Sequence, residues 1–190
     1  MAQLKDTLTH YLTDLPAGTF PMLFTSNHDE NTWNGTEYEK YGDMAKPLAV
    51  FNCTWNAIPL LYTAQELPLH KRLPFFDKDE INWNGTPQLE DFYKKLLHLH
   101  KQHPALIAGD AAKPQFITTN NDHILAFVRK RDGKEVLVLL NFSATEVTVQ
   151  LAANAAQGSF TNLFTQQTVT VNNSFTPVLK AWDYLVLVKS

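Results

Sequence analysis

The spacing of the apolar residues changes once along the chain, near residues 103–113. Before this point, apolar residues recur every three or four positions over residues 4–15, 43–55 and 88–103, which predicts amphipathic helices. After it they recur at every second position in short runs, which predicts β-strands. A pattern with a helical period does not also suit a strand, so the chain must contain two regions of different class. We expect an α/β region followed by an all-β region, with the boundary between His103 and Lys113.

Two apolar runs in the first region predict buried parallel strands. They span residues 20–26 and 58–63, and polar residues crowd in directly after each of them. The helix expected between them makes a right-handed parallel crossover the expected link. The last helix of this region has the clearest start signal, because Thr86 is a good N-cap and Pro87 fits the first helical position.

The second region contains a hairpin signature. Ile124–Val128 and Glu135–Leu140 are runs of apolar and β-branched residues, and the Asp132-Gly133 dipeptide between them is typical of a tight turn. Short strands at regular spacing, with no helix between them, predict an antiparallel sandwich. The further strands are expected at residues 146–151, 159–164, 167–171 and 182–188.

Composition excludes several classes of protein. The chain has 190 residues, 44% of them hydrophobic, which is enough for a sizeable core and excludes a disordered or fibrous protein. The formal net charge of -3 argues against a nucleic-acid partner. No run approaches the ~20 apolar residues that span a bilayer, and residues 1–6 show no signal-peptide pattern, so we expect no membrane partner and leave the localisation unknown. The single cysteine, Cys53, is expected to be an inert core thiol.

The most informative motif is the triplet Asn27-His28-Asp29, which follows the first apolar strand. The carboxyl ends of parallel strands are where α/β proteins bind ligands and mount catalytic groups. A carboxylate beside a histidine can stabilise a developing cation and hydrogen-bond sugar hydroxyls. The triplet alone fits equally well a polar strand-to-loop turn in which Asn and Asp cap backbone groups.

The wider stretch Phe24–Asn31 (Phe-Thr-Ser-Asn-His-Asp-Glu-Asn) resembles the fourth conserved segment of the α-amylase superfamily of glycoside hydrolases. The resemblance implies an α+β fold class: residues 1–108 are the last two β/α units of a (β/α)8 barrel, and residues 109–190 are the antiparallel β-sandwich that follows it. In that arrangement residues 20–26 are barrel strand seven and residues 58–63 are strand eight. The match continues through Trp33–Thr36, Tyr62–Glu66 and Lys71–Lys78.

The resemblance also implies roles for single residues. Asp29 matches the catalytic carboxylate with which the family stabilises its oxocarbenium-like transition state, and His28 matches the residue that hydrogen-bonds the attacked sugar. Trp33 follows the same loop and is our candidate for a sugar-stacking platform, whereas Trp55, Trp83 and Trp182 are expected in the core. In the segment after strand eight, Ala64 replaces the usual glycine and Glu66 is the family's acidic residue.

What the chain lacks limits the expected activity. Retaining glycosidases need two carboxyl groups about 5–5.5 Å apart, one as nucleophile and one as acid/base. In the family these come from strands four and five, which have no counterpart in this sequence. The calcium ligands of the family also lie mainly in the missing half, so we expect no metal and no cofactor in this chain. The chain alone is expected to bind α-glucan oligosaccharides such as starch fragments without hydrolysing them.

Two alternatives from other classes remain open. The first alternative is a non-catalytic carbohydrate-binding module that keeps His28, Asp29 and Trp33. The second is a structural fragment that self-associates. In the second case, a homodimer through the exposed half-barrel is the expected remedy for unpaired strand edges. A metal site at His98, His100 and His103 is disfavoured, because histidines near a helix C-terminus are favoured by the helix dipole in any case.

Overall fold

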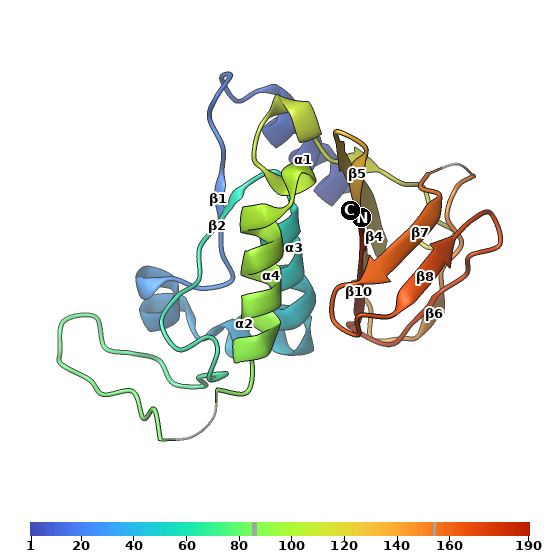
Figure 1. Ribbon diagram of the computed structural model, residues 1–190. Coiled ribbons are helices and arrows are strands. Elements are labelled where there is room, and N and C mark those ends of the chain that lie inside the picture. Colours follow the sequence, from blue (N-terminus) through green and yellow to red (C-terminus); the bar gives the residue numbers. More distant parts are fainter. Residues whose placement is uncertain (85–86, 154) are drawn as a thin grey trace.

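The computed structural model describes residues 1–84, 87–153 and 155–190. Helices lie on one side of a six-stranded antiparallel sheet, and a separate two-stranded sheet, β6–β9, packs against the other side. In Figure 1 the helices stand to the left of the large sheet, and the short parallel pair β1–β2 lies beyond them. The mixed α+β class and the large antiparallel sheet confirm the predicted fold class.

The secondary structure follows the predicted order. The α-helices are α1 (Ala2–Thr13), α2 (Glu37–Tyr41), α3 (Ala45–Thr54) and α4 (Glu90–Gln102). Shorter helical turns are a π-helical turn at Glu30–Asn34 and 3-10 turns at Gly42–Met44, Pro104–Leu106 and Asp110–Ala112. The strands are β1 (Met22–Leu23), β2 (Ile58–Pro59), β3 (Gln115–Phe116), β4 (Ile124–Arg131), β5 (Lys134–Asn141), β6 (Val147–Thr148), β7 (Gly158–Asn162), β8 (Thr168–Val171), β9 (Val178–Leu179) and β10 (Tyr184–Lys189).

β1 and β2 pair in parallel, as predicted, with Met22 opposite Ile58. The amide of Ile58 donates to Pro21 O at 2.9 Å, and the amide of Leu60 donates to Leu23 O at 2.9 Å. Both strands are much shorter than the predicted runs 20–26 and 58–63, so those bounds were wrong. Within the described residues each strand pairs only with the other, and a two-stranded ladder that contains Pro59 has few amides with which to continue.

The last helix also begins later than predicted. α4 starts at Glu90 with Leu89 at its N-cap position, and Pro87 lies before the helix rather than at its first position. The proposed N-cap Thr86 lies outside the described residues. The amide of Leu89 donates to Glu66 O at 2.8 Å, and this tie to the loop after β2 fixes where the helix can begin.

The β4–β5 hairpin confirms the turn prediction. Asp132 and Gly133 both adopt positive φ, +53° and +78°, as a two-residue hairpin turn of the primed type requires. Eight residue pairs then register from Arg131–Lys134 out to Ile124–Asn141. The large sheet has the strand order β3-β4-β5-β10-β7-β8. Strands were predicted near β6, β7, β8 and β10, but β6 contains only two residues, and Leu151 further along the chain forms an isolated bridge with Thr119.

The central strands of the large sheet are buried on both faces. On β4, Leu125 and Phe127 face α3 and α4, while Ile124 and Val128 face the β6–β9 layer. This explains why β4 and β5 are almost continuously apolar instead of alternating with polar residues. The apolar cluster on the helical side includes residues from before and after position 108. The boundary between residues 1–108 and 109–190 therefore stays a prediction, since the two regions share this core.

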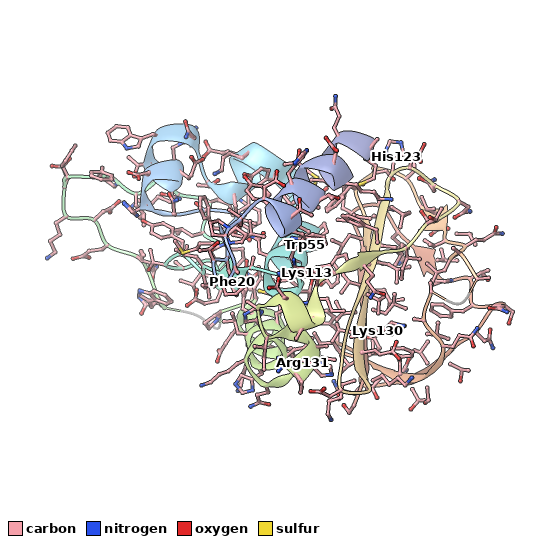
Figure 2. The ribbon with its side chains drawn as sticks, turned by 90° about the horizontal axis from the view of Figure 1, so that it is seen from above. Phe20, Trp55, Lys113, His123, Lys130 and Arg131 are labelled. Atoms are coloured by element: carbon pink, nitrogen blue, oxygen red, sulfur yellow. The ribbon has the colours of Figure 1, made fainter. Side chains whose placement is uncertain are left out.

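Two residues of the helical region illustrate this core. Cys53 is buried, and burial raises the pKa of its thiol to about 12, which confirms the prediction of an inert core thiol. Trp55 is also buried, and its ring packs edge-on against Phe127 of β4 with centroids 5.0 Å apart. Figure 2 shows Trp55 at the junction between the helices and the large sheet.

The buried cation Arg129 lies at this junction. Its guanidinium is fully buried on β4 and donates to Trp55 O at 2.8 Å, to Ala112 O at 2.7 Å and to Ile107 O at 2.9 Å. Further bonds reach Leu106 O and the side-chain oxygen of Asn56. Among the described residues no carboxylate lies within salt-bridge distance. Burial lowers the pKa of Arg129 to about 10, so the group stays charged at neutral pH.

We predict that Arg129→Met lowers the free energy of unfolding by at least about 3 kcal/mol, because several buried carbonyls lose their donor and each costs about 1–3 kcal/mol. The unfolding free energy of Arg129→Lys should lie between those of wild type and Arg129→Met, since an ammonium cannot reach all the acceptors that surround the planar guanidinium. Arg131→Met, two residues along the same strand at a partly exposed position, is the matched control and should cost under about 0.5 kcal/mol. Urea denaturation measures all four proteins; equal stability of Arg129→Met and wild type would contradict the prediction.

Candidate functional site

The Asn27-His28-Asp29 triplet follows the carboxyl end of β1 after three intervening residues and leads into the π-helical turn Glu30–Asn34. The side chain of Asn27 accepts a hydrogen bond from the amide of Glu30 at 2.8 Å, and its carbonyl accepts from the amide of Asn31 at 2.9 Å. Asn27 thus caps backbone groups, as the structural interpretation of the triplet requires. His28 and Asp29 do not share that task, because their side chains are 68% and 59% exposed.

His28 and Asp29 form a small polar pair that faces solvent. His28 Nε2 lies 3.6 Å from a carboxylate oxygen of Asp29. The carboxylate presents acceptor oxygens and negative charge, and the imidazole presents a donor, so together they can hold hydroxyl groups and stabilise positive charge. Apart from this contact with each other, neither side chain makes a hydrogen bond to the described part of the chain, so both are available to a ligand.

An exposed aromatic group borders this pair. Trp33 is 59% exposed and its ring lies 5.7 Å, centroid to centroid, from the ring of Phe75. Phe75 in turn lies 5.8 Å from the ring of His28. We did not predict Phe75, although it lies in a stretch that resembles the family. Trp83 is 50% exposed and was wrongly expected in the core, whereas Trp55 is buried as expected.

Below the triplet, a buried polar cluster joins the two strand ends. The carboxylate of Glu37, on α2, accepts hydrogen bonds from Thr25 Oγ1 at 2.6 Å and from Gln65 Nε2 at 2.7 Å. The side-chain oxygen of Gln65 accepts from the amide of Tyr62 at 2.6 Å. Burial raises the pKa of the Glu37 carboxyl, against the opposing effect of these donors. The cluster fixes the loop that carries His28 and Asp29 against the loop that follows β2.

The turn after β2 tolerates alanine where the family has glycine. Ala64 is buried and adopts φ +63°, a left-handed conformation that costs an L-residue roughly 1–2 kcal/mol. The neighbouring Gln65, whose amide donates to Tyr62 O, is held in place by the buried cluster. Glu66 is partly exposed, and its backbone carbonyl is the group that accepts from Leu89.

The three histidines of α4 and its C-terminal cap lie apart from this site. His100 Nδ1 lies 2.9 Å from Cys53 O, and His103 Nε2 lies 3.4 Å from Lys189 O, while His98 is exposed. Within residues 1–84, 87–153 and 155–190, no group of three or more potential ligand side chains is placed to hold a metal ion. No helix in the described part of the chain is long and apolar enough to cross a membrane.

We predict that Glu37 makes the protein less stable as pH rises. Because the folded state raises the pKa of Glu37, it binds a proton more tightly than the unfolded state, and that advantage is lost as pH rises from about 4.5 through the folded pKa. Glu37→Gln keeps a hydrogen-bond acceptor but cannot ionise. Urea denaturation between about pH 4.5 and about pH 7.5 should show a larger fall in unfolding free energy for wild type than for Glu37→Gln. Parallel pH profiles for the two proteins would contradict this.

The comparisons with known proteins agree with the resemblance. Residues 115–186 match the family described as maltogenic amylase, C-terminal domain. Alpha-amylase 2 of Dictyoglomus thermophilum is 28% identical over 159 residues, which cover 74% of this chain and 25% of that protein. The maltogenic alpha-amylase of Bacillus acidopullulyticus is 26% identical, covering 75% of this chain and 25% of its own. The chain thus spans about a quarter of the length of these curated relatives.

Solved structures share the whole fold at lower identity. An α-amylase from Lactobacillus plantarum superposes on 100% of this chain with a TM-score of 0.77 and 19% identity, and the match covers 43% of that protein. A maltogenic α-amylase from Thermotoga neapolitana superposes on 100% of this chain with a TM-score of 0.76, and the match covers 46% of that protein. The helical region, the parallel strand pair and the large sheet are therefore found together in larger proteins. Taken together, the family match and the curated relatives make this chain similar to the C-terminal region of α-amylase superfamily members, and the solved structures show that it shares their fold.

Proposed function

We propose that this chain forms one wall of an α-glucan-binding active site, with Asp29 as the transition-state-stabilising carboxylate and His28 and Trp33 as substrate-binding residues. The observation that carries this proposal is the exposed His28–Asp29 pair at the carboxyl end of a parallel strand, where the fold leaves both side chains free. A carboxylate, an imidazole and an adjacent aromatic ring suit a pyranose, which has hydroxyl groups around an apolar face.

The relatives support an α-glucan as the ligand class. The relatives named above are described as amylases, and a solved structure of 16% identity and TM-score 0.72 is that of AmyP in complex with maltose. We extend this ligand class to the present chain because its exposed polar pair and aromatic ring offer the contacts such a ligand needs. No metal or cofactor enters this proposal.

We also propose that the chain alone does not hydrolyse its ligand. The role of Asp29 is to stabilise charge that a separate nucleophile and a separate acid must first create. Two carboxylates close to Asp29 in the sequence have other partners: Glu30 binds Lys40 at 3.0 Å, and Glu37 is buried in its polar cluster. Electrostatic stabilisation from one carboxylate falls short of the ~8–23 kcal/mol by which enzymes lower their barriers.

We predict that the chain binds maltoheptaose and releases no product from it. His28→Ala should weaken binding by up to about tenfold, since one hydrogen bond to a sugar hydroxyl contributes about 0.5–1.5 kcal/mol. His123→Ala, an exposed histidine on the large-sheet side (Figure 2), is the matched control and should bind like wild type. Isothermal titration measures binding, and a reducing-sugar assay measures turnover. Turnover above background that disappears in Asp29→Asn would overturn the inactive-wall proposal.

We further propose that the isolated chain self-associates through the outer face of β1 and β2. Met22 and Ile58, which are opposite each other in the parallel ladder, are 54% and 51% exposed. Phe24 and Leu61 add further exposed apolar surface next to them. Exposed apolar side chains beside unpaired strand edges favour association with a second copy of the chain.

We predict that sedimentation at about tens of micromolar shows a dimer, an estimate of where such patches associate. Met22→Lys should shift the chain toward monomer, because it places a charge in the proposed interface. Val178→Lys, at an equally exposed apolar position (54%) on β9, is the matched control and should leave the association unchanged. A single monomeric species for wild type would contradict the proposal.

A further inference from the structure

The loop of residues 67–84, between β2 and α4, contains no helix or strand and projects from the body on the side away from the large sheet (Figure 1). Despite its irregular course, part of this loop returns to the segment that carries His28 and Asp29. Because loops held in a defined place by a rigid scaffold often carry binding residues, its contacts with that segment are informative.

Three sets of contacts attach the loop at Arg72 and Leu73. The amide of Leu73 donates to the side-chain oxygen of Asn31 at 2.7 Å, and Thr32 Oγ1 donates to Leu73 O at 2.7 Å. Arg72 Nε lies 3.0 Å and 3.1 Å from the two carboxylate oxygens of Glu39. Asn31 is buried, so its bond to Leu73 is shielded from water. The backbone of the loop is therefore fixed immediately before Phe75.

This attachment places Phe75 between two rings of the other segment. Its centroid is 5.8 Å from that of His28 and 5.7 Å from that of Trp33, and the ring planes are inclined by only 36° and 32°. Phe75 remains 40% exposed and Trp33 59% exposed, so the three rings form an open row rather than a piece of core. Phe76, 84% exposed, stands against Phe75 edge-on, at an interplanar angle of 68°.

An exposed row of aromatic faces that ends at a polar pair has a defined chemical preference. The apolar face of a pyranose packs on an aromatic ring, and the hydroxyl groups at the rim of the sugar then reach the polar groups beside it. A ligand that occupies only the His28–Asp29 end would leave Phe75 and Trp33 in water. A longer oligosaccharide would cover them.

We infer that Phe75 is a substrate-contacting residue that extends the sugar surface of His28 and Asp29 toward Trp33 by further glucosyl units, and so makes binding depend on oligosaccharide length. The inference rests on the proposed function and adds to it a residue and a specificity. Asn31 is the positioning residue, because its hydrogen bond to Leu73 holds the loop in register.

The test compares maltose with maltoheptaose by titration calorimetry on the full chain. Phe75→Ala should raise the Kd for maltoheptaose about two- to tenfold and leave the Kd for maltose within about twofold. Phe76→Ala, the neighbouring and more exposed phenylalanine, is the matched control and should change neither. Phe75→Tyr should restore the affinity, whereas Phe75→Leu, which is apolar but has no aromatic face, should not.

A second comparison tests the positioning role. If Asn31 acts through Phe75, Asn31→Ala should weaken maltoheptaose binding in wild type and have no further effect in Phe75→Ala. The inference fails if Phe75→Ala and Phe76→Ala behave alike, or if Phe75→Ala weakens both sugars equally. In either case His28→Ala still reports on the proposed function. Absence of sugar binding by the wild-type chain would overturn both.

Discussion

The guanidinium of Arg129 is the point on which the helical region and the large sheet both depend. Four backbone carbonyls, from the end of α3, the turn at Pro104–Leu106 with the residue after it, and the turn at Asp110–Ala112, converge on it. These carbonyls lie at or just after the ends of helical elements, so they lack hydrogen-bond partners within their own elements. One planar group with several donors satisfies them together, which an apolar side chain or a lysine would not do.

This arrangement differs from an ordinary buried ion pair. A buried cation without a carboxylate is costly, and it persists only when enough acceptors surround it. Here four of the acceptors belong to the backbone and cannot be removed by substitution, and the side-chain oxygen of Asn56 adds one more. The cation therefore ties the connection between the two regions to one geometry, and the apolar cluster of Trp55 and Phe127 closes around it. The shared core and the shared cation together explain why the face of the sheet toward the helices is as buried as the face toward the β6–β9 layer.

At the candidate site, unlike at Arg129, only some of the polar groups are buried and the others face solvent. Its supporting residues, Thr25, Glu37 and Gln65, are buried and hydrogen-bonded to one another, while the residues above them face solvent. A ligand-binding surface needs both: buried groups that fix the backbone and exposed groups that remain unsatisfied by the fold. The loop of residues 67–84 is fixed in the same way, through buried Asn31, and carries its aromatic ring outward.

The sequence by itself determined the class of each region, the parallel pairing of the two short strands, the Asp132-Gly133 hairpin and the position of His28 and Asp29 after a strand. These features follow from local spacing and turn chemistry, which the chain carries at each position. Only the tertiary structure decided that Arg129, in a strand that ends Arg-Lys-Arg, is buried on the carbonyl of a residue 74 positions earlier. It also decided that Phe75 lies beside His28, and that β1 and β2 are short. Periodicity indicates which face of an element is apolar, but the partners of buried polar groups and of loop side chains depend on which distant segments meet, and no local pattern records that.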